Sequence, residues 1–336
     1  MMELRLKSGL QRASIGGFAL PLGLIPTSIR PPTVGYTFSY NPSREDEPDT
    51  YTFEVVVSHE RLRPLIGRAF ALLPEEVFAV VEIGSRDAYR MMDVHVGERT
   101  ITREAFLEGW ARHEPFLLED CSIGVGARSE EPLLEVFLDA WKILTIHVPL
   151  SMRDDVEELL QSEGLEEVPM TWPEEEEDDP PHGWRFRPVL ELPDGTAAEA
   201  DDLLTRLRQE WRLVLNVDPE SNIDEAGREL GLTLWQAVIS VGWSEGGRRR
   251  QAYVSLWAAA GSLATIERFV EQALEERPQW KLLGIDAMDR VAYDDRPEEL
   301  AHLPPRPERE EIHLVVVEPG GDATALPPPA SGEQRG

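Results

Sequence analysis

The sequence has little of what marks an exported, membrane-spanning or thiol-dependent protein. Cys121 is the single cysteine among 336 residues, so the chain cannot form an intrachain disulfide or a cysteine-rich zinc site. The longest apolar stretch near the N-terminus, residues 15–25, is interrupted by glycine and proline and is too short to cross a bilayer. These absences predict a soluble protein of a reducing compartment, the cytoplasm.

Basic residues are also scarce. The chain has 33 Lys and Arg against 63 Asp and Glu, a formal net charge of -30. Such a charge repels phosphate backbones and anionic lipid surfaces, which argues against nucleic acid and membranes as partners and favours a basic protein. The excess is uneven, because residues 151–182 carry thirteen acidic groups and only one basic residue, Arg153.

No contiguous catalytic or cofactor motif is present, and the sequence implies no cofactor. Gly124-Val125-Gly126 lacks the third glycine and the following helix of a dinucleotide-binding loop. Cys121 follows Glu119-Asp120, whose negative charges are expected to raise the pKa of its thiol and so to disfavour a nucleophilic role.

Stretches rich in glycine, proline or charge, and the periodic apolar segments between them, divide the chain into five zones. A hydrophobic share of 41% over this length is enough for two domains, each with its own core. The predicted zones are an N-terminal arm (1–50), a first domain (51–170), an acidic linker (171–183), a second domain (184–300) and a tail (301–336) that is largely disordered after residue 319. Residues 313–317 of the tail are apolar enough to add one strand.

The periodic segments predict an α+β fold. Residues 53–57 and 77–83 read as strands on either side of a helix with apolar residues at helical spacing from Leu62 to Leu73. In the second block, a capping box at 196–199 is expected to open a helix, and residues 234–243 and 251–257 form a hairpin followed by a helix that Ser262 caps. We therefore expect two sequential antiparallel-sheet domains with helices on one face.

The similar order of elements in the two blocks has two explanations. One is a duplicated ferredoxin-like β-α-β-β-α-β module, supported by short similar segments such as Ile123-Gly-Val-Gly126 and Ile239-Ser-Val-Gly242. The other is coincidence, because similarities over four residues arise by chance. Either explanation concerns architecture, and fold does not by itself imply function.

A loop in the second block resembles a calcium-binding loop in the spacing of its oxygen side chains. Ile223 replaces the glycine that the sharp turn of such a loop needs, and the flanks are strand-like, so a solvated loop is the alternative. The candidate ligands of a hard cation, at positions 1, 3, 5, 7 and 12, are Asp218, Glu220, Asn222, Asp224 and Glu229.

Three strand residues form a second polar candidate. Asp93 and His95 lie two residues apart, so their side chains share one face of a strand, and His147 lies on another predicted strand. Two imidazoles and a carboxylate are suited to a metal or to acid–base chemistry. The site requires the two strands to be neighbours, which the sequence does not establish, and hydrogen-bonded structural histidines are the alternative.

The predicted hairpin is rich in aromatic side chains and carries the one basic cluster of the chain. These residues are expected either to form the core beneath the helices or to expose a protein-binding surface, since Trp, Tyr and Arg anchor interfaces. The candidate interface residues are Trp235, Trp243, Arg248, Arg249, Arg250, Tyr253 and Trp257.

Together these observations favour a non-enzymatic acidic protein that binds another protein, as an adaptor, an inhibitor or an immunity-like protein. Its expected partner is a basic protein. The alternative is an enzyme, or a sensor of a small molecule or cation, whose site is assembled from scattered residues. The absence of a motif does not exclude this alternative, because most active sites are not contiguous in sequence.

Overall fold

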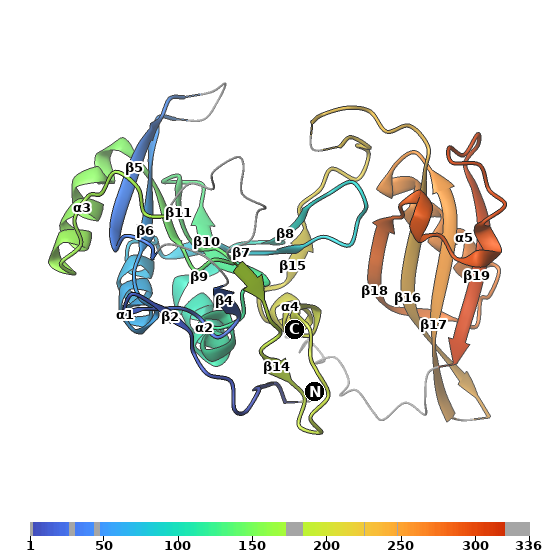
Figure 1. The fold of residues 1–336 in the computed structure, drawn as a ribbon. Helices are drawn as coiled ribbons and strands as arrows, with labels where there is room; N and C mark the ends of the chain where they lie inside the picture. The colour runs from blue at the N-terminus through green and yellow to red at the C-terminus, as the bar shows by residue number, and fades with distance from the viewer. Residues whose placement is uncertain are drawn as a thin grey trace, which may run out of the picture. The chain divides into compact units, whose positions relative to one another are not determined.

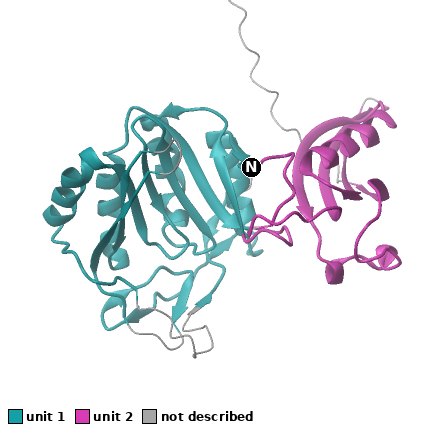
Figure 2. Cartoon of the chain, turned by 90° about the horizontal axis from the view of Figure 1, so that it is seen from above, with its two compact units in different colours: residues 1–84, 92–216 teal, residues 85–91, 217–336 magenta. Residues whose placement is uncertain are grey.

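The computed structural model describes residues 3–26, 31–43, 48–172, 184–224, 226–246 and 248–319. Contacts divide the chain into two compact units (Figure 2). Unit 1 comprises Met1–Gly84 and Met92–Asn216, and unit 2 comprises Ser85–Met91 and Val217–Gly336. The loop Ser85–Met91 thus belongs to unit 2, although the strands before and after it belong to unit 1. No helix among the described residues has the length and apolar character needed to cross a membrane.

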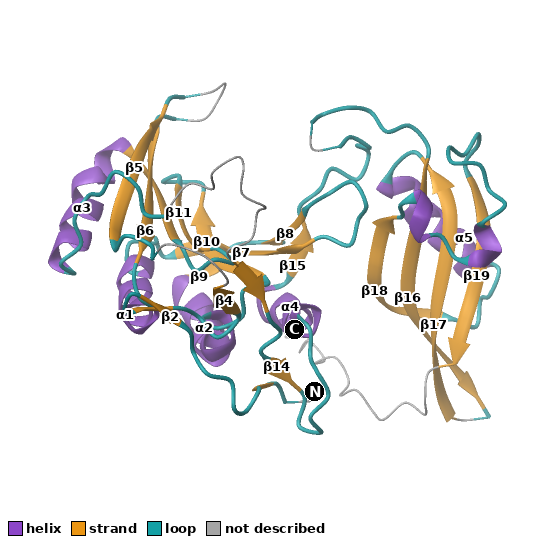
Figure 3. Cartoon of the chain, in the orientation of Figure 1, coloured by secondary structure: helices purple, strands orange, loops and turns teal. Residues whose placement is uncertain are grey.

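Unit 1 is built on a nine-stranded sheet in which every pairing is antiparallel (Figures 1 and 3). The strand order is β15-β8-β7-β10-β11-β12-β6-β5, and β9 also pairs with β7. The strands are β5 (Gly35–Asn41), β6 (Thr50–Val56), β7 (Glu76–Gly84), β8 (Met92–Gly97), β9 (Ile101–Thr102), β10 (Ile123–Ser129), β11 (Leu134–Leu138), β12 (Leu144–Pro149) and β15 (Leu213–Leu215).

Four helices contribute to the core on one face of this sheet. They are α1 (His59–Phe70), α2 (Arg103–Leu117), α3 (Arg153–Ser162) and α4 (Ala200–Trp211). Alternate residues of the strands, such as Val77, Ala79 and Val81 of β7, form one buried cluster with apolar side chains of all four helices. The cluster includes Phe70 and Trp211, both almost fully buried. The period-2 pattern of the strands and the period-3.6 pattern of the helices therefore meet in a single core.

The first residues of the helices show which of the predicted caps are formed. Thr102 caps α2, because its hydroxyl oxygen accepts from Ala105 N. Ser151 does not cap α3 as expected, since it lies within the 3-10 turn η1 (Leu150–Met152). The capping box of α4 also differs from the predicted one and is formed by Glu199 and Asp202. Residues 197–198 stay extended because the backbone of Ala198 donates to Leu190 O, so the helix begins later than predicted.

The N-terminal arm forms short strands that pair with segments far along the chain. These are β1 (Arg5–Leu6), β2 (Ser14–Ile15), β3 (Phe18–Ala19) and β4 (Leu24–Pro26), with β13 (Trp184–Phe186) and β14 (Leu190–Glu191) as the distant partners. β1 pairs with β14, β4 pairs with β13, and β2 pairs with β3. Residues 3–26 are thus built into unit 1.

Unit 2 contains a four-stranded antiparallel sheet with the order β18-β16-β17-β19. Its strands are β16 (Thr233–Glu245), β17 (Arg248–Ala260), β18 (Lys281–Arg290) and β19 (Glu311–Pro319). The helix α5 (Leu263–Glu275) follows β17, and two 3-10 turns, η2 (Tyr293–Asp295) and η3 (Glu298–Leu300), lie between β18 and β19. The predicted hairpin, the strand around residues 313–317 and the Ser262 cap, which accepts from Thr265 N, are confirmed.

Alternation along β16 and β17 decides which side chains of unit 2 are buried. Odd-numbered residues of β16 from Trp235 to Val241 and even-numbered residues of β17 from Ala252 to Ala260 pack with Ile266 and Val270 of α5. The even residues of β16 and the odd residues of β17 point to the opposite face of the sheet. We call this surface the face opposite α5.

The structure confirms an α+β chain with five α-helices and mostly antiparallel sheets among its described residues. It does not confirm a duplicated ferredoxin-like module, since the sheet of unit 1 has nine strands and the sheet of unit 2 has four. The boundary between the units follows Asn216 rather than lying in 171–183, because α4 and β15 join the sheet and core of unit 1. Most of the predicted linker (173–183) and the tail from residue 320 lie outside the described residues.

Candidate functional site

The predicted interface residues divide between the two faces of the unit 2 sheet. Trp235 lies on the α5 face and is 2% exposed. Its Nε1 donates to Ala260 O, and its ring lies 5.5 Å from the guanidinium carbon of Arg290. Trp235 is therefore part of the core, as expected of a large aromatic side chain with a partner for its N–H.

The hairpin end of the α5 face holds a second aromatic group. Trp243 packs on Trp280 with ring centroids 6.2 Å apart, and the guanidinium of Arg277 lies 4.9 Å from the Trp280 ring. Arg250 is directly opposite Trp243 in the hairpin and pairs with Glu245 at 3.4 Å. Trp280 and Arg277 were not candidates from the sequence, because α5 and its following turn separate them from the hairpin along the chain.

The face opposite α5 exposes a different set of apolar side chains. Tyr253 of β17 is 52% exposed, and Trp257 lies on the same face, half-buried beside its cross-strand partner Leu314. Leu283 of β18 is 50% exposed and would contact a Cβ at Gly242, which places its side chain over that glycine. Val316 of β19, opposite Ser255, is 39% exposed.

Charged side chains border this surface. Arg249 pairs with Ser244 in the hairpin register and Lys281 pairs with Gly242, so both cations lie on the face opposite α5 at its hairpin end, and both are exposed. Glu318 of β19 lies opposite Tyr253 and adds a carboxylate to this border. We define the aromatic surface of unit 2 as Tyr253, Trp257, Leu283, Leu314 and Val316 with the two cations Arg249 and Lys281.

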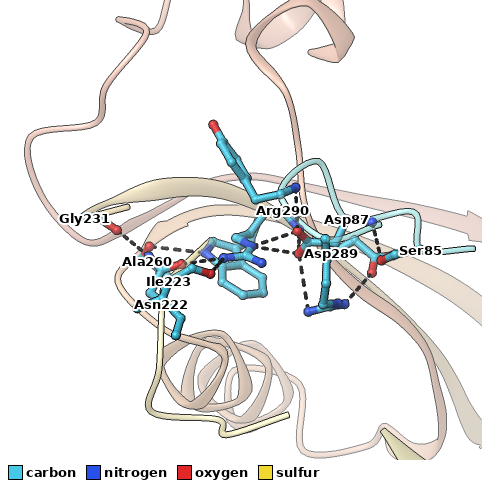
Figure 4. Close-up of polar contacts among 11 residues, drawn as sticks. Ser85, Asp87, Asn222, Ile223, Gly231, Ala260, Asp289 and Arg290 are labelled. Atoms are coloured by element: carbon cyan, nitrogen blue, oxygen red, sulfur yellow. Dashed lines mark hydrogen bonds and ion pairs between the residues drawn. The ribbon is translucent and has the colours of Figure 1, made fainter. Parts of the chain in front are cut away.

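A buried ion pair joins the loop Ser85–Met91 to the end of β18 (Figure 4). Nε of Arg290 donates to both carboxylate oxygens of Asp87 at 2.9 Å, and the backbone N of Arg290 donates to Asp87 Oδ2. Ala88 N donates to Arg290 O in return. Both side chains are almost fully buried, at 5% and 0% exposed, so Arg290 depends on Asp87 for compensation of its charge, while Asp87 has Arg90 as a second cation at 3.8 Å.

The same arginine organises the loop that resembles a calcium site. Arg290 Nη1 donates to Asn222 Oδ1 at 3.0 Å and to Ile223 O at 3.2 Å. Asn222 in turn donates through Nδ2 to Gly231 O. The carbonyl oxygen of this predicted cation ligand is thus already used by a protein donor.

The remaining predicted ligands of the cation are arranged as turn residues. Asp218 Oδ1 accepts from Glu220 N, and Asp224 accepts from Ala226 N and Arg228 N and forms an ion pair with Arg228. Glu229 forms an isolated bridge with Ile223 through its backbone. Nowhere in the described ranges do three or more His, Cys, Asp or Glu side chains gather in a way that could hold a metal ion.

The sheet of unit 1 keeps the second predicted polar site apart. Asp93 and His95 lie on β8, His147 lies on β12, and β7, β10 and β11 run between these strands. At about 4.8 Å per strand, the separation is about 19 Å across the sheet. His95 is opposite Val81 on the helix-covered face, whereas His147 lies on the other face, so the three residues do not form one site.

His147 belongs instead to a row of polar side chains that crosses the face of unit 1 opposite its helices. The cross-strand order is Arg128, Glu135, His147 and Thr52, on four neighbouring strands. Thr52 Oγ1 and His147 Nδ1 are 2.7 Å apart and share a hydrogen bond. The register of β10, β11 and β12 creates this row, which is why only His147 was recognisable from the sequence.

Two carboxyl groups on this face have raised pKa values. Burial raises the pKa of Glu135, and Arg128 opposes the shift. Burial also raises the pKa of Glu82, and the charge of Glu135 adds to the shift. The ring of Phe137 contributes to this burial, since it lies over Gly124 and Gly126, where Cβ atoms would approach it within 3 Å. Perturbed carboxyls of this kind occur at binding and catalytic sites and also in structural clusters.

A third polar cluster binds the N-terminal arm to the ends of α1 and α2 within unit 1. Glu119, just after α2, accepts hydrogen bonds from Arg12 at 2.5 and 3.0 Å, from Leu22 N at 2.8 Å, and contacts His59 Nε2 at 3.1 Å. Burial alone would raise the pKa of Glu119, but the hydrogen bonds of His59 and Arg12 lower it to about 2. Ser58, before α1, donates to Glu60 and accepts from Ala19 N, so it also holds the arm.

Cys121 and Lys142 are buried next to this cluster. Burial raises the pKa of the Cys121 thiol to about 12, and Asp120 and Glu119 add to the shift, as the sequence predicted for the acidic neighbours. Lys142 donates to Ile123 O at 2.9 Å and Asp139 O at 3.3 Å, and burial lowers its pKa. Since the thiol is protonated at neutral pH and both groups are enclosed, we assign them structural roles.

No protein-family model, no curated protein and no solved structure matches this chain.

Proposed function

We propose that this chain is a non-catalytic protein-binding protein whose partner docks on the aromatic surface of unit 2. The observation that carries the proposal is the exposure of Tyr253, Leu283 and Val316 on one face of the four-stranded sheet, at 52%, 50% and 39%. Large apolar side chains grouped on a rigid surface are typical of a protein interface, because burying them against a partner releases the water they order. The proposal includes an adaptor, an inhibitor or an immunity-like protein.

The composition of the surface supports a protein partner rather than a small ligand. Tyr and Trp are the most frequent anchors of interfaces, and they lose little conformational entropy on binding. Between Tyr253 and Trp257 in β17 lies Ser255, and its neighbours across the sheet are Val238 and Val316. A row of small side chains between aromatic ones suits an extended or flat partner segment that covers several strands.

The local charges favour an acidic partner segment, in contrast to the basic partner that the net charge of -30 predicts. At its hairpin end this face carries two exposed cations, Arg249 and Lys281, and the carboxylate of Glu318 lies opposite Tyr253. Exposed charges beyond about 8 Å are largely screened at physiological salt, so nearby groups influence a docked segment more than the total charge does. We therefore infer that the docked segment carries acidic residues beside its apolar ones.

A purified partner tests this proposal. The full chain is used as bait, the protein recovered with it is expressed and purified, and its Kd is measured by calorimetry. We expect the double substitution Tyr253→Ala and Trp257→Ala to weaken binding at least about 30-fold, the effect of losing about 2 kcal/mol at a hot spot. Tyr40→Ala is the matched control, since Tyr40 is 50% exposed on β5 of unit 1. Equal affinities for the double variant and the wild type would contradict the proposal.

A charge reversal separates an acidic partner from a basic one. Arg249→Glu with Lys281→Glu should weaken binding of an acidic segment, and the difference from the wild type should shrink as salt is raised. Tighter binding by the reversed variant would show that the partner is basic and would overturn the charge assignment while leaving the surface assignment intact.

The second candidate function is the binding of a small polar molecule on unit 1. It is favoured by one observation, the half-buried carboxyls of Glu82 and Glu135 with raised pKa values beside Arg128. Neither carboxyl forms a hydrogen bond or an ion pair with another residue of the described ranges. If this function is the correct one, Glu135→Gln will abolish stabilisation by a ligand in a thermal-shift screen, and the unit 2 double variant will leave it unchanged.

A further inference from the structure

The two main sheets end in four edge strands that are protected to different degrees. They are β5 and β15 in unit 1, and β18 and β19 in unit 2. An edge strand presents backbone N–H and C=O groups that pair readily with another strand, so folded proteins shorten, bend, charge or cover their edges.

Three of the four edges have such protection. β15 is three residues long. The backbone of Tyr36, in β5, donates to Glu166 O and accepts from Val168 N, so a neighbouring segment covers the start of that edge. β18 has two register shifts against β16, and Ala88 N from the loop Ser85–Met91 donates to the O of Arg290 at its end.

β19 is less protected, since its one register shift against β17 lies near its start, at His313. Its residues from Leu314 to Pro319 follow the register of β17 without a shift, and the sequence Leu314-Val315-Val316-Val317 has neither a charge nor a proline. Val316 and Val317 are 39% and 41% exposed. The backbone of β19 makes no hydrogen bond to a described segment other than β17. About 13 Å of apolar strand edge, from Leu314 to Val317, is thus available for pairing.

We propose that β19 pairs antiparallel with β19 of a second copy of this chain, which joins two four-stranded sheets into one of eight strands. The inference does not depend on the proposed function. A two-fold axis perpendicular to the sheet keeps the faces of the two copies aligned, so directly opposed residues must come from the same face. The register centred on Val315 satisfies this condition for Leu314, Val315 and Val316, which follow the register of β17 without a shift.

In that register the opposed side chains are compatible. Val315 faces Val315 of the second copy, and Leu314 faces Val316. The register shift at His313 ends this regular pairing, and Glu318 lies beyond it, so no like charges are directly opposed. Pairing of β19 with β18 of another copy is disfavoured, because the register shifts and the loop Ser85–Met91 protect that edge.

The mass of the full chain in solution tests the proposal. Light scattering after gel filtration should give the mass of two chains, and the dimer should strengthen with added salt, because two chains of net charge -30 repel each other. Val316→Lys should give the mass of one chain with an unchanged circular dichroism spectrum, because it places a charge against Leu314 of the second copy. Val214→Lys is the control, since Val214 is 47% exposed on the short edge β15. A wild type with the mass of one chain at all concentrations and salts overturns the proposal.

A cross-link tests the register without relying on a disruptive substitution. Directly opposed residues of antiparallel strands have Cα atoms about 4.5–5.5 Å apart, within the range of a disulfide. Val315→Cys should therefore form an intermolecular disulfide on mild oxidation, whereas Leu282→Cys, 44% exposed on β18, should not. The native Cys121 is 3% exposed and does not compete. Equal cross-linking at both positions would mean random collision and would contradict the pairing.

Discussion

The two main sheets of this protein differ in the face that their α-helices leave open. In unit 1 that face carries a row of polar groups, Arg128, Glu135, His147 and Thr52, and its carboxyls Glu82 and Glu135 have raised pKa values. In unit 2 the corresponding face carries Tyr253, Leu283 and Val316, which are 52%, 50% and 39% exposed. Exposed polar groups form hydrogen bonds with water, whereas a cluster of exposed apolar side chains has an unfavourable free energy of contact with water.

This difference indicates which face another macromolecule should cover. Covering the apolar face removes an unfavourable contact with water, while covering the polar face requires a matching hydrogen-bond partner for each group. The same comparison extends to two buried carboxylates. Asp87 in unit 2 holds a loop against a sheet, and Glu119 in unit 1 holds the N-terminal arm in the same way.

The largest loss in the free energy of unfolding is expected for Asp87→Ala in unit 2. The substitution leaves the guanidinium of Arg290 buried without its counter-ion, which costs about 3–5 kcal/mol. Chemical denaturation and hydrogen exchange of peptides from β16 and β18 would measure the loss. Arg228→Ala is the control, because Arg228 is 79% exposed in its ion pair with Asp224 and an exposed, screened ion pair should contribute little to stability. A loss as small as that of the control would mean that the loop Ser85–Met91 is not needed for the stability of unit 2.

A somewhat smaller, pH-dependent effect is expected for Glu119→Gln in unit 1. The folded pKa of Glu119 is lowered from 4.5 to about 2, so its carboxylate stabilises the fold above about pH 4.5 and loses this contribution as the pH falls through 2. The shift corresponds to about 3 kcal/mol. Urea unfolding from about pH 7 to about pH 2 should therefore show a gap between wild type and variant that closes at low pH. A constant gap would assign the stabilisation to packing rather than to charge.

The smallest change, a gain rather than a loss in the free energy of unfolding, is expected for Glu135→Gln. Because burial raises the folded pKa of Glu135, its contribution to stability is present at low pH and is lost as the pH rises through that folded pKa. The variant should thus have a slightly higher free energy of unfolding than the wild type at neutral pH, and the two should converge at low pH. Glu54→Gln, an exposed substitution on the same face, provides the comparison. A destabilised Glu135→Gln at neutral pH would show that the carboxylate is paired and would weaken the contrast between the faces.

Local patterns in the sequence predicted most helices and strands. The spacing of Leu62, Leu65, Ile66, Ala69 and Phe70 identified α1, and all five are buried as expected. Errors occurred where a distant backbone determined the local conformation. Residues 197–198 pair with β14 instead of starting α4, and α4 itself belongs to unit 1.

Site residues were harder to predict because their partners are far apart in the chain. Asp87 and Arg290 are 203 residues apart, and Arg12 and Glu119 are 107 apart. Nothing near Asp87 or Arg290 in the sequence marks them as buried. By contrast, the aromatic content of the hairpin was visible, although the sequence did not show which aromatic side chains are covered.

The sequence by itself determined the α+β class, the hairpin of β16 and β17 and the amphipathic α5, because these follow from periodicity and capping within short segments. Only the tertiary structure decided that Trp235 is buried while Tyr253 is exposed, and that Glu135 rather than Asp93 accompanies His147. Strand order and register set these relationships. They depend on the free energy of packing the whole chain, which no local pattern encodes.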